Sequence, residues 1–62
     1  MPIIRVEMFE GKTNDQKRTL VKELTKGFTI ACGGQPEKIH EVINEISKEC
    51  WALGGELCSE KN

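Results

Sequence analysis

The amino-acid sequence predicts a small α+β domain that spans residues 1–62. Three observations support this fold class. Residues 2–9 alternate as a strand does, residues 14–32 repeat apolar side chains at helical spacing, and a diglycine near the carboxyl end indicates a tight turn. The segment between the helix and the diglycine is rich in isoleucine and valine.

The first element is a strand, predicted over residues 2–9 (PIIRVEMF). Alternation divides its side chains between two faces, with Ile4, Val6 and Met8 on one and Ile3, Arg5, Glu7 and Phe9 on the other. The strand begins at the very start of the chain. Residues 10–12 (EGK) then predict a turn that leads into the helix.

The second element is a helix, predicted over residues 14–32. Thr13 and Gln16 form a capping box, in which each side chain satisfies a free backbone N–H of the other residue. An apolar stripe follows at helical spacing, made of Leu20, Val21, Leu24, Phe28 and Ala31. The glycines at 33 and 34 predict the end of the helix, and Pro36 comes soon after them.

Residues 36–50 (PEKIHEVINEISKEC) leave two structures open. A helix beginning at Pro36 is favoured by the spacing of Ile39, Val42, Ile43, Ile46 and Cys50. A strand buried on both faces is favoured by the β-branched character of most of these side chains. Periodicity does not decide between the two. Further along, residues 52–57 (ALGGEL) predict a turn or a short hairpin around the diglycine.

The length of the chain favours self-association. A domain of this size folding alone hides only about 60% of its unfolded surface, so a monomer is expected to be marginally stable. Three cysteines cannot all pair within one chain, and no secretory signal precedes them. We therefore expect free thiols and a cytoplasmic location, and association between subunits remains as the source of stability.

Charge and hydropathy argue against two classes of partner. Nine basic and ten acidic residues give a net charge of −1, without the basic surplus of a nucleic-acid-binding protein. The apolar stretches are too short to enter a membrane. We expect neither nucleic acid nor membrane as a partner.

Three motifs together resemble the 4-oxalocrotonate tautomerase family. They are Pro-Ile directly after the initiator Met1, EGKTNDQK at residues 10–17 and GGEL at residues 54–57. The resemblance covers nearly the whole chain. It implies a tautomerase/MIF-like fold, in which a β-α-β unit with parallel strands carries a short C-terminal β-hairpin, so that residues 39–46 form the second strand. It also implies a homohexamer built as a trimer of dimers, and an isomerase that acts in aromatic degradation.

Pro2 is the candidate catalytic base. Removal of Met1 would leave a secondary amine at the tip of the first strand, as the resemblance implies. An ordinary α-amino group has a pKa of about 7.7–8.0, and burial in an apolar pocket lowers the pKa of such an amine. A base poised near the working pH is suited to proton transfer at carbon. If Met1 is retained, the Pro2 nitrogen is an amide and cannot act as a base.

Three residues are candidates for binding a substrate carboxylate. The resemblance places Lys12 and His40 where the family commonly has arginines, which bind the carboxylate groups of the substrate. Lysine keeps the charge but loses the bidentate fork, and a neutral imidazole offers a single donor without a fixed charge. Arg5 lies on the same strand as Pro2 and is a possible replacement. Each also has a simpler reading as an ordinary surface or strand residue.

Aromatic side chains are expected to line the pocket. Trp51 occupies the position of an aromatic wall in the family, and Phe9 is expected to contribute to the same lining. A core or interface tryptophan is the simpler reading of Trp51, and both readings hold if the pocket forms between subunits. The cysteines and the histidine match no zinc signature, so we expect neither a metal nor a cofactor.

The leading functional prediction is the ketonisation of a 2-hydroxy-dienoate or related enol acid, such as 2-hydroxymuconate, by the Pro2 amine. An alternative is a non-catalytic or partner-dependent subunit of a mixed hexamer, motivated by Lys12 and His40. Hydration or dehalogenation by the same base ranks below these. A helical hairpin without an active site follows if the spacing in residues 37–50 is taken at face value.

Overall fold

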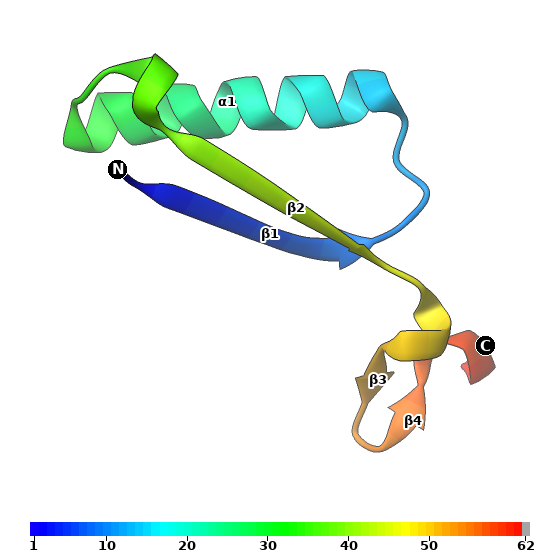
Figure 1. Ribbon diagram of the computed structural model, residues 1–62. Coiled ribbons are helices and arrows are strands. Elements are labelled where there is room, and N and C mark those ends of the chain that lie inside the picture. The colour runs from blue at the N-terminus through cyan, green and yellow to red at the C-terminus, as the bar shows by residue number, and fades with distance from the viewer. Residues whose placement is uncertain (62) are drawn as a thin grey trace.

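The computed structural model describes residues 1–61, which form one β-α-β unit followed by a small hairpin (Figure 1). The regular elements are β1 (Ile3–Phe9), α1 (Asn14–Cys32), β2 (His40–Ile46), β3 (Ala52–Leu53) and β4 (Glu56–Leu57). Short 3-10 turns span Pro36–Lys38, Lys48–Cys50 and Cys58–Glu60. β1 and β2 pair in parallel, and β3 and β4 pair antiparallel. The predicted fold class is confirmed.

The parallel pair β1–β2 has one covered face and one open face. In register, Ile3 lies beside His40 and Phe9 lies beside Ile46. Side chains at even positions of β1, such as Ile4 and Val6, are half-buried on the side of α1, whereas Ile3 remains 50% exposed. Helix α1 therefore covers one face of the sheet, and the other face lies open (Figure 1).

Helix α1 begins at the predicted capping box. The Gln16 N–H donates to the Thr13 hydroxyl at 3.1 Å, and the Thr13 N–H donates to the Gln16 side-chain oxygen at 2.9 Å. At the other end, the Gly33 N–H donates to the Thr29 carbonyl. Gly33 has a φ of 77°, a conformation that glycine adopts without the strain other residues meet. The bounds predicted for this helix are confirmed.

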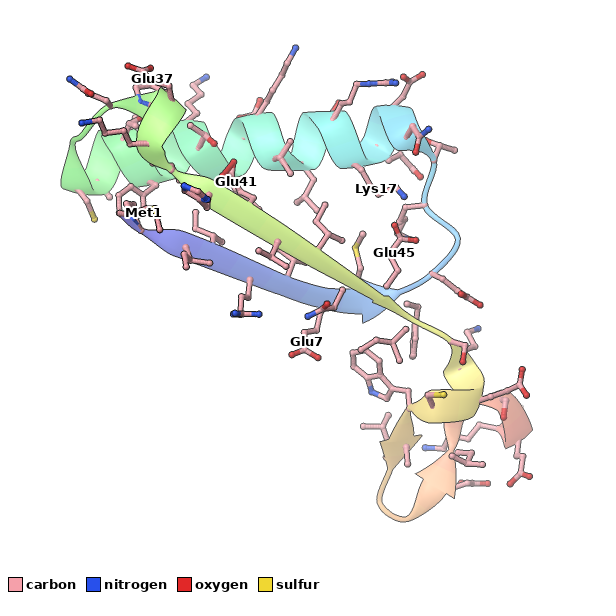
Figure 2. The ribbon with its side chains drawn as sticks, in the orientation of Figure 1. Met1, Glu7, Lys17, Glu37, Glu41 and Glu45 are labelled. Carbon is pink, nitrogen blue, oxygen red and sulfur yellow. The ribbon has the colours of Figure 1, made fainter. Side chains whose placement is uncertain are left out.

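The segment with two possible structures is the strand β2, preceded by one 3-10 turn. The strand that the resemblance implied for residues 39–46 is confirmed, with β2 beginning one residue later, and the alternatives of a second helix and of a helical hairpin are excluded. Polar side chains on the inner face of β2 interrupt the alternation of apolar and polar residues that is typical of a strand, so the apolar residues fall at a helical spacing. The Thr25 hydroxyl of α1 donates to the Glu41 carboxylate, and the Lys17 ammonium of α1 forms an ion pair with Glu45 (Figure 2).

The hairpin β3–β4 packs at the carboxyl end of β1. The Phe9 and Trp51 rings lie 4.6 Å apart between centroids and are tilted by 59°. The Cys58 N–H donates to the Trp51 carbonyl at 2.7 Å, which closes the hairpin. The predicted turn around the diglycine is confirmed, with Gly54 and Gly55 both at positive φ.

A single chain is extended and buries little. Its radius of gyration is 14.7 Å, against about 10.6 Å for a compact domain of this length. Its accessible surface is 4901 Å², against about 4000 Å² for a compact protein of this mass. Among residues 1–61, only Ile39 is buried, with 9% of its surface exposed. The single chain therefore exposes more surface than a compact domain of its mass.

None of the helices in residues 1–61 combines the length and the apolar character needed to cross a membrane. The thiols of Cys32, Cys50 and Cys58 are all free.

Candidate active site

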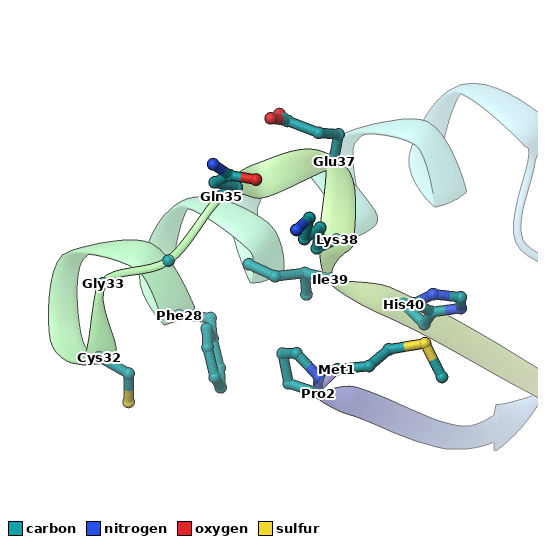
Figure 3. A pocket seen from close by; sticks show the side chains of 11 residues that line it. Met1, Pro2, Phe28, Cys32, Gly33, Gln35, Glu37, Lys38, Ile39 and His40 are labelled. Carbon is teal, nitrogen blue, oxygen red and sulfur yellow. The ribbon is translucent and has the colours of Figure 1, made fainter.

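A cavity of about 840 Å³ lies around Pro2, at the amino-terminal end of β1 (Figure 3). Three parts of the chain line it: the first two residues, the carboxyl end of α1 with its following glycines, and the 3-10 turn that leads into β2. The lining residues are Met1, Pro2, Phe28, Cys32, Gly33, Gly34, Gln35, Glu37, Lys38, Ile39 and His40.

Pro2 is held by the backbone of the neighbouring strand. The His40 N–H donates to the Pro2 carbonyl oxygen at 3.0 Å, so the sheet hydrogen bonds reach the second residue of the chain. Pro2 is half-buried, and Phe28 of α1 lines the same cavity. Met1 is 84% exposed and acylates the Pro2 nitrogen in this structure. Removal of Met1 would open a secondary amine into the cavity.

Ionisable side chains in the cavity come from α1, the 3-10 turn and β2. They are Cys32, Glu37, Lys38 and His40. Lys38 ends the 3-10 turn Pro36–Lys38, and its N–H donates to the Gln35 carbonyl at 3.0 Å. Figure 3 shows the Glu37 carboxylate directed away from Pro2. Lys38 is thus the permanently cationic side chain of the cavity within residues 1–61.

Pro2 and His40 were predicted from the sequence, and one chain brings these two residues together. Lys38 and Phe28 were not predicted, and the fold brings them to the same cavity as Pro2 from 36 and 26 positions away. The run Pro36-Glu37-Lys38 directly before the second strand was the available signal, because the loop before a parallel strand lies at the same end of the sheet as the start of its neighbour.

The other predicted residues lie at the opposite end of β1. Phe9 and Trp51 form the aromatic pair beside the hairpin, with the Lys48 ammonium 5.6 Å from the Phe9 ring centroid. Phe9 is seven residues beyond Pro2, a distance of about 23 Å along an extended strand. Lys12 is exposed in the loop after β1. A single chain therefore does not bring these three residues to Pro2.

Arg5 lies between the two ends, on the open face of the sheet. It is exposed, and its register partner is Val42 of β2. Arg5 does not line the cavity around Pro2. Within one chain, Arg5 is therefore not placed to bind a carboxylate next to Pro2.

Residues 1–61 contain no group of three or more His, Cys, Asp or Glu side chains placed to hold a metal ion. The chemical groups available in the cavity are a potential secondary amine, one ammonium, one imidazole, one carboxylate and one thiol, bordered by the apolar Phe28 and Ile39. Such a set can move a proton and bind an anion.

These features define a class of small proteins in which a parallel β-α-β unit carries a potential amine base directly before its first strand. A family model described as tautomerase enzyme matches residues 2–61. The chain therefore belongs to the tautomerase family, which confirms the resemblance noted in the sequence.

Three relatives illustrate the similarity. The 2-hydroxymuconate tautomerase of Bacillus subtilis is 38% identical over 60 residues, which cover 97% of both chains. The crystal structure of a homologue of 4-oxalocrotonate tautomerase superposes with a TM-score of 0.94 at 36% identity, covering 98% of this chain and 100% of the other. A heterohexamer 4-oxalocrotonate tautomerase from Chloroflexus aurantiacus gives a TM-score of 0.92 at 26% identity, covering both chains completely.

Proposed function

We propose that this tautomerase ketonises a 2-hydroxy-dienoate or a related enol acid with the Pro2 amine as general base. The observation that carries the proposal is the position of Pro2, which lines a cavity of about 840 Å³ at the very start of β1. Similarity to a 2-hydroxymuconate tautomerase supports this class of substrate.

The proposed reaction needs one proton acceptor. The neutral Pro2 nitrogen takes the proton of the enol hydroxyl, and the oxygen electrons form the carbonyl while the conjugated double bonds shift. The far carbon of the conjugated system then takes the proton back from the Pro2 ammonium. Phe28 and Ile39 make part of the cavity wall apolar, which disfavours a charged amine and lowers its pKa toward the working range. No cofactor is required, because the conjugated keto acid accepts the electrons itself.

We further propose that neighbouring subunits complete the site. Lys12 and the Phe9–Trp51 pair lie about one strand length from Pro2 of their own chain. They contribute to a pocket if the hairpin end of one subunit meets the Pro2 end of another. The extended shape and the low burial of the single chain support such an assembly. We propose a homohexamer, made of three dimers.

Replacing the base tests the mechanism. Pro2→Ala leaves a primary amine without the rigid ring, and we expect kcat/KM for phenylenolpyruvate and 2-hydroxymuconate to fall by about 10²–10⁴-fold, the usual contribution of a general base. Mass spectrometry must first show that Met1 is absent from both proteins. In a second variant, a residue that is not cleaved remains before Pro2, so that the Pro2 nitrogen stays acylated. This variant should also be inactive. Unchanged turnover in Pro2→Ala would eliminate the amine mechanism.

A partner-dependent subunit is the second candidate function. Lys12 and His40 stand where the resembled family commonly has arginines, and one structural relative is a heterohexamer. Under this alternative, processed protein purified alone turns over neither substrate, and activity appears on mixing with a companion chain that supplies the arginines. If the homo-oligomer alone turns over either substrate and Pro2→Ala abolishes this turnover, the partner-dependent alternative is excluded.

A further inference from the structure

The cavity around Pro2 contains a cation that no motif of the sequence assigns. Lys38 lines it together with Pro2, and within residues 1–61 the ammonium of Lys38 forms no ion pair with a carboxylate. Its sequence neighbour Glu37 points away from Pro2 (Figure 3). The positive charge of Lys38 is therefore available to an anionic ligand.

The backbone around Lys38 is fixed relative to Pro2. The Lys38 N–H and the Ile39 N–H donate to the carbonyls of Gln35 and Pro36, at 3.0 and 3.1 Å. Ile39, the next residue, is anchored in the core, and the following N–H, that of His40, holds the Pro2 carbonyl. A short hydrogen-bonded stretch of backbone thus joins Lys38 to the hydrogen bond that positions Pro2.

We propose that Lys38 determines specificity by binding the substrate carboxylate adjacent to the enol carbon, which is the carboxylate nearest to Pro2. This inference rests on the proposed function. A base must come within hydrogen-bond reach of the enol hydroxyl. Because the carboxylate is bonded to the carbon that bears this hydroxyl, it then also lies close to the Pro2 nitrogen. Lys38 shares the cavity with that nitrogen, whereas Lys12 lies at the other end of β1.

The same charge assists the proton transfer. An ammonium that lines the same cavity as the reacting atoms stabilises the negative charge that develops when the enol loses its proton. It also disfavours protonation of the neighbouring amine, so it keeps the Pro2 nitrogen in its basic form. The other titratable side chains that line the cavity are Cys32, Glu37 and His40. Of the four, Lys38 supplies the fixed positive charge.

Substrates with one and two carboxylates test the assignment in the full, processed chain. Phenylenolpyruvate carries only the carboxylate adjacent to the enol, whereas 2-hydroxymuconate has a distal one as well. Lys38→Gln removes the charge and keeps a polar side chain that is one atom shorter. We expect it to raise KM for both substrates about 10- to 100-fold, the loss typical of one charge-assisted hydrogen bond. Lys38→Arg should restore most of the affinity.

Two further measurements separate binding from a structural role. The acidic limb of the kcat/KM pH profile should move to higher pH in Lys38→Gln, because the Pro2 amine loses a neighbouring cation. Calorimetric binding of phenylpyruvate, which needs no turnover, should weaken by the same factor as KM. Lys22→Gln removes an exposed lysine of α1 that lies outside the cavity and is the matched control, with both values unchanged.

The outcomes distinguish this inference from the proposed function. If Lys38→Gln affects 2-hydroxymuconate alone, the distal carboxylate is its ligand and the assignment is overturned. If both substrates and phenylpyruvate retain wild-type values in Lys38→Gln while Pro2→Ala is inactive, the inference fails and the amine mechanism stands. If phenylpyruvate binding weakens in Lys38→Gln although Pro2→Ala remains active, Lys38 binds the carboxylate and the base has to be sought elsewhere.

Discussion

Ile39 connects the core of the subunit to the cavity. It is buried between α1 and the sheet, it lines the space around Pro2, and its two sequence neighbours are Lys38 and His40. An isoleucine in this place stabilises the fold through apolar burial and at the same time fixes the backbone from which two polar side chains reach the cavity.

Two isoleucines that differ in exposure test this view of the core. Ile39→Ala should lower the free energy of unfolding by about 2–5 kcal/mol, the range for deleting a buried isoleucine. Ile30→Ala removes a side chain that is 75% exposed and should cost no more than about 0.5 kcal/mol. Urea denaturation at one fixed subunit concentration measures both, because the stability of an oligomer depends on concentration. Equal losses in the two variants would contradict the assignment of Ile39 as the core residue.

At the level of single residues, the sequence predicted part of the candidate site. Pro2 was predicted because it follows Met1 directly in a sequence that also carries the other two motifs of the resembled family. Lys38 and Phe28 were not, since their relation to Pro2 arises from the crossover that brings the end of α1 and the start of β2 to the first strand. Lys12, Phe9 and Trp51 remain predictions, because no contact within one chain brings them to Pro2.

The helix α1 depends on local signals that the sequence contains in full. The capping box satisfies two backbone N–H groups at its start, and the apolar stripe faces the sheet. Because the capping partners are three residues apart and the stripe follows the helical period, neither signal needs knowledge of the tertiary structure. The predicted bounds of this helix were accordingly confirmed.

Removing the cap gives a prediction at this scale. Thr13→Ala loses the acceptor for the Gln16 N–H and should destabilise the protein by about 1 kcal/mol. Thr13→Ser keeps the hydroxyl and is the matched control. Thermal unfolding at fixed subunit concentration should show a lower Tm for the alanine variant only. A serine variant that is as unstable as the alanine variant would show that the hydroxyl is not the stabilising group.

The strand β2 shows why local pattern failed over residues 36–50. Its inner face has Ile43 between two glutamates, and apolar Val42 lies on the outer face. Hydropathy therefore does not alternate, and the apolar residues fall at spacings of three and four by coincidence. The glutamates are accommodated by Thr25 and Lys17 of α1, which lie 16 and 28 residues away. A local window does not contain those partners.

At the scale of the whole molecule, we expect the open face and the free edges of the sheet to determine whether copies of the chain associate in solution. A two-stranded parallel sheet covered on one side only is rare in isolated domains, since parallel sheets are normally covered on both faces. Ile3 and Val42 are 50% and 37% exposed on the uncovered face. We expect neighbouring subunits to cover these side chains.

Light scattering tests the assembly. We expect a mass of six copies of the 7.0 kDa chain. Val42→Lys places a charge on the open face of the sheet and should reduce the mass to that of smaller species, with a loss of activity. Ile30→Lys places the same charge on α1, away from the sheet, and should leave the mass unchanged. A monomeric wild-type protein at micromolar concentration would contradict the assembly and the shared site together.

The hydrogen bond from His40 to the Pro2 carbonyl has a practical consequence for handling the protein. Since the sheet already includes the second residue, any purification tag fused to the amino terminus would run directly through the cavity and would leave the nitrogen acylated. The 3-10 turn Cys58–Glu60 lies at the other end of the subunit (Figure 1), so a tag there leaves the Pro2 end of its own chain untouched. Under the proposed mechanism, protein with an amino-terminal tag would be inactive because its Pro2 nitrogen is acylated.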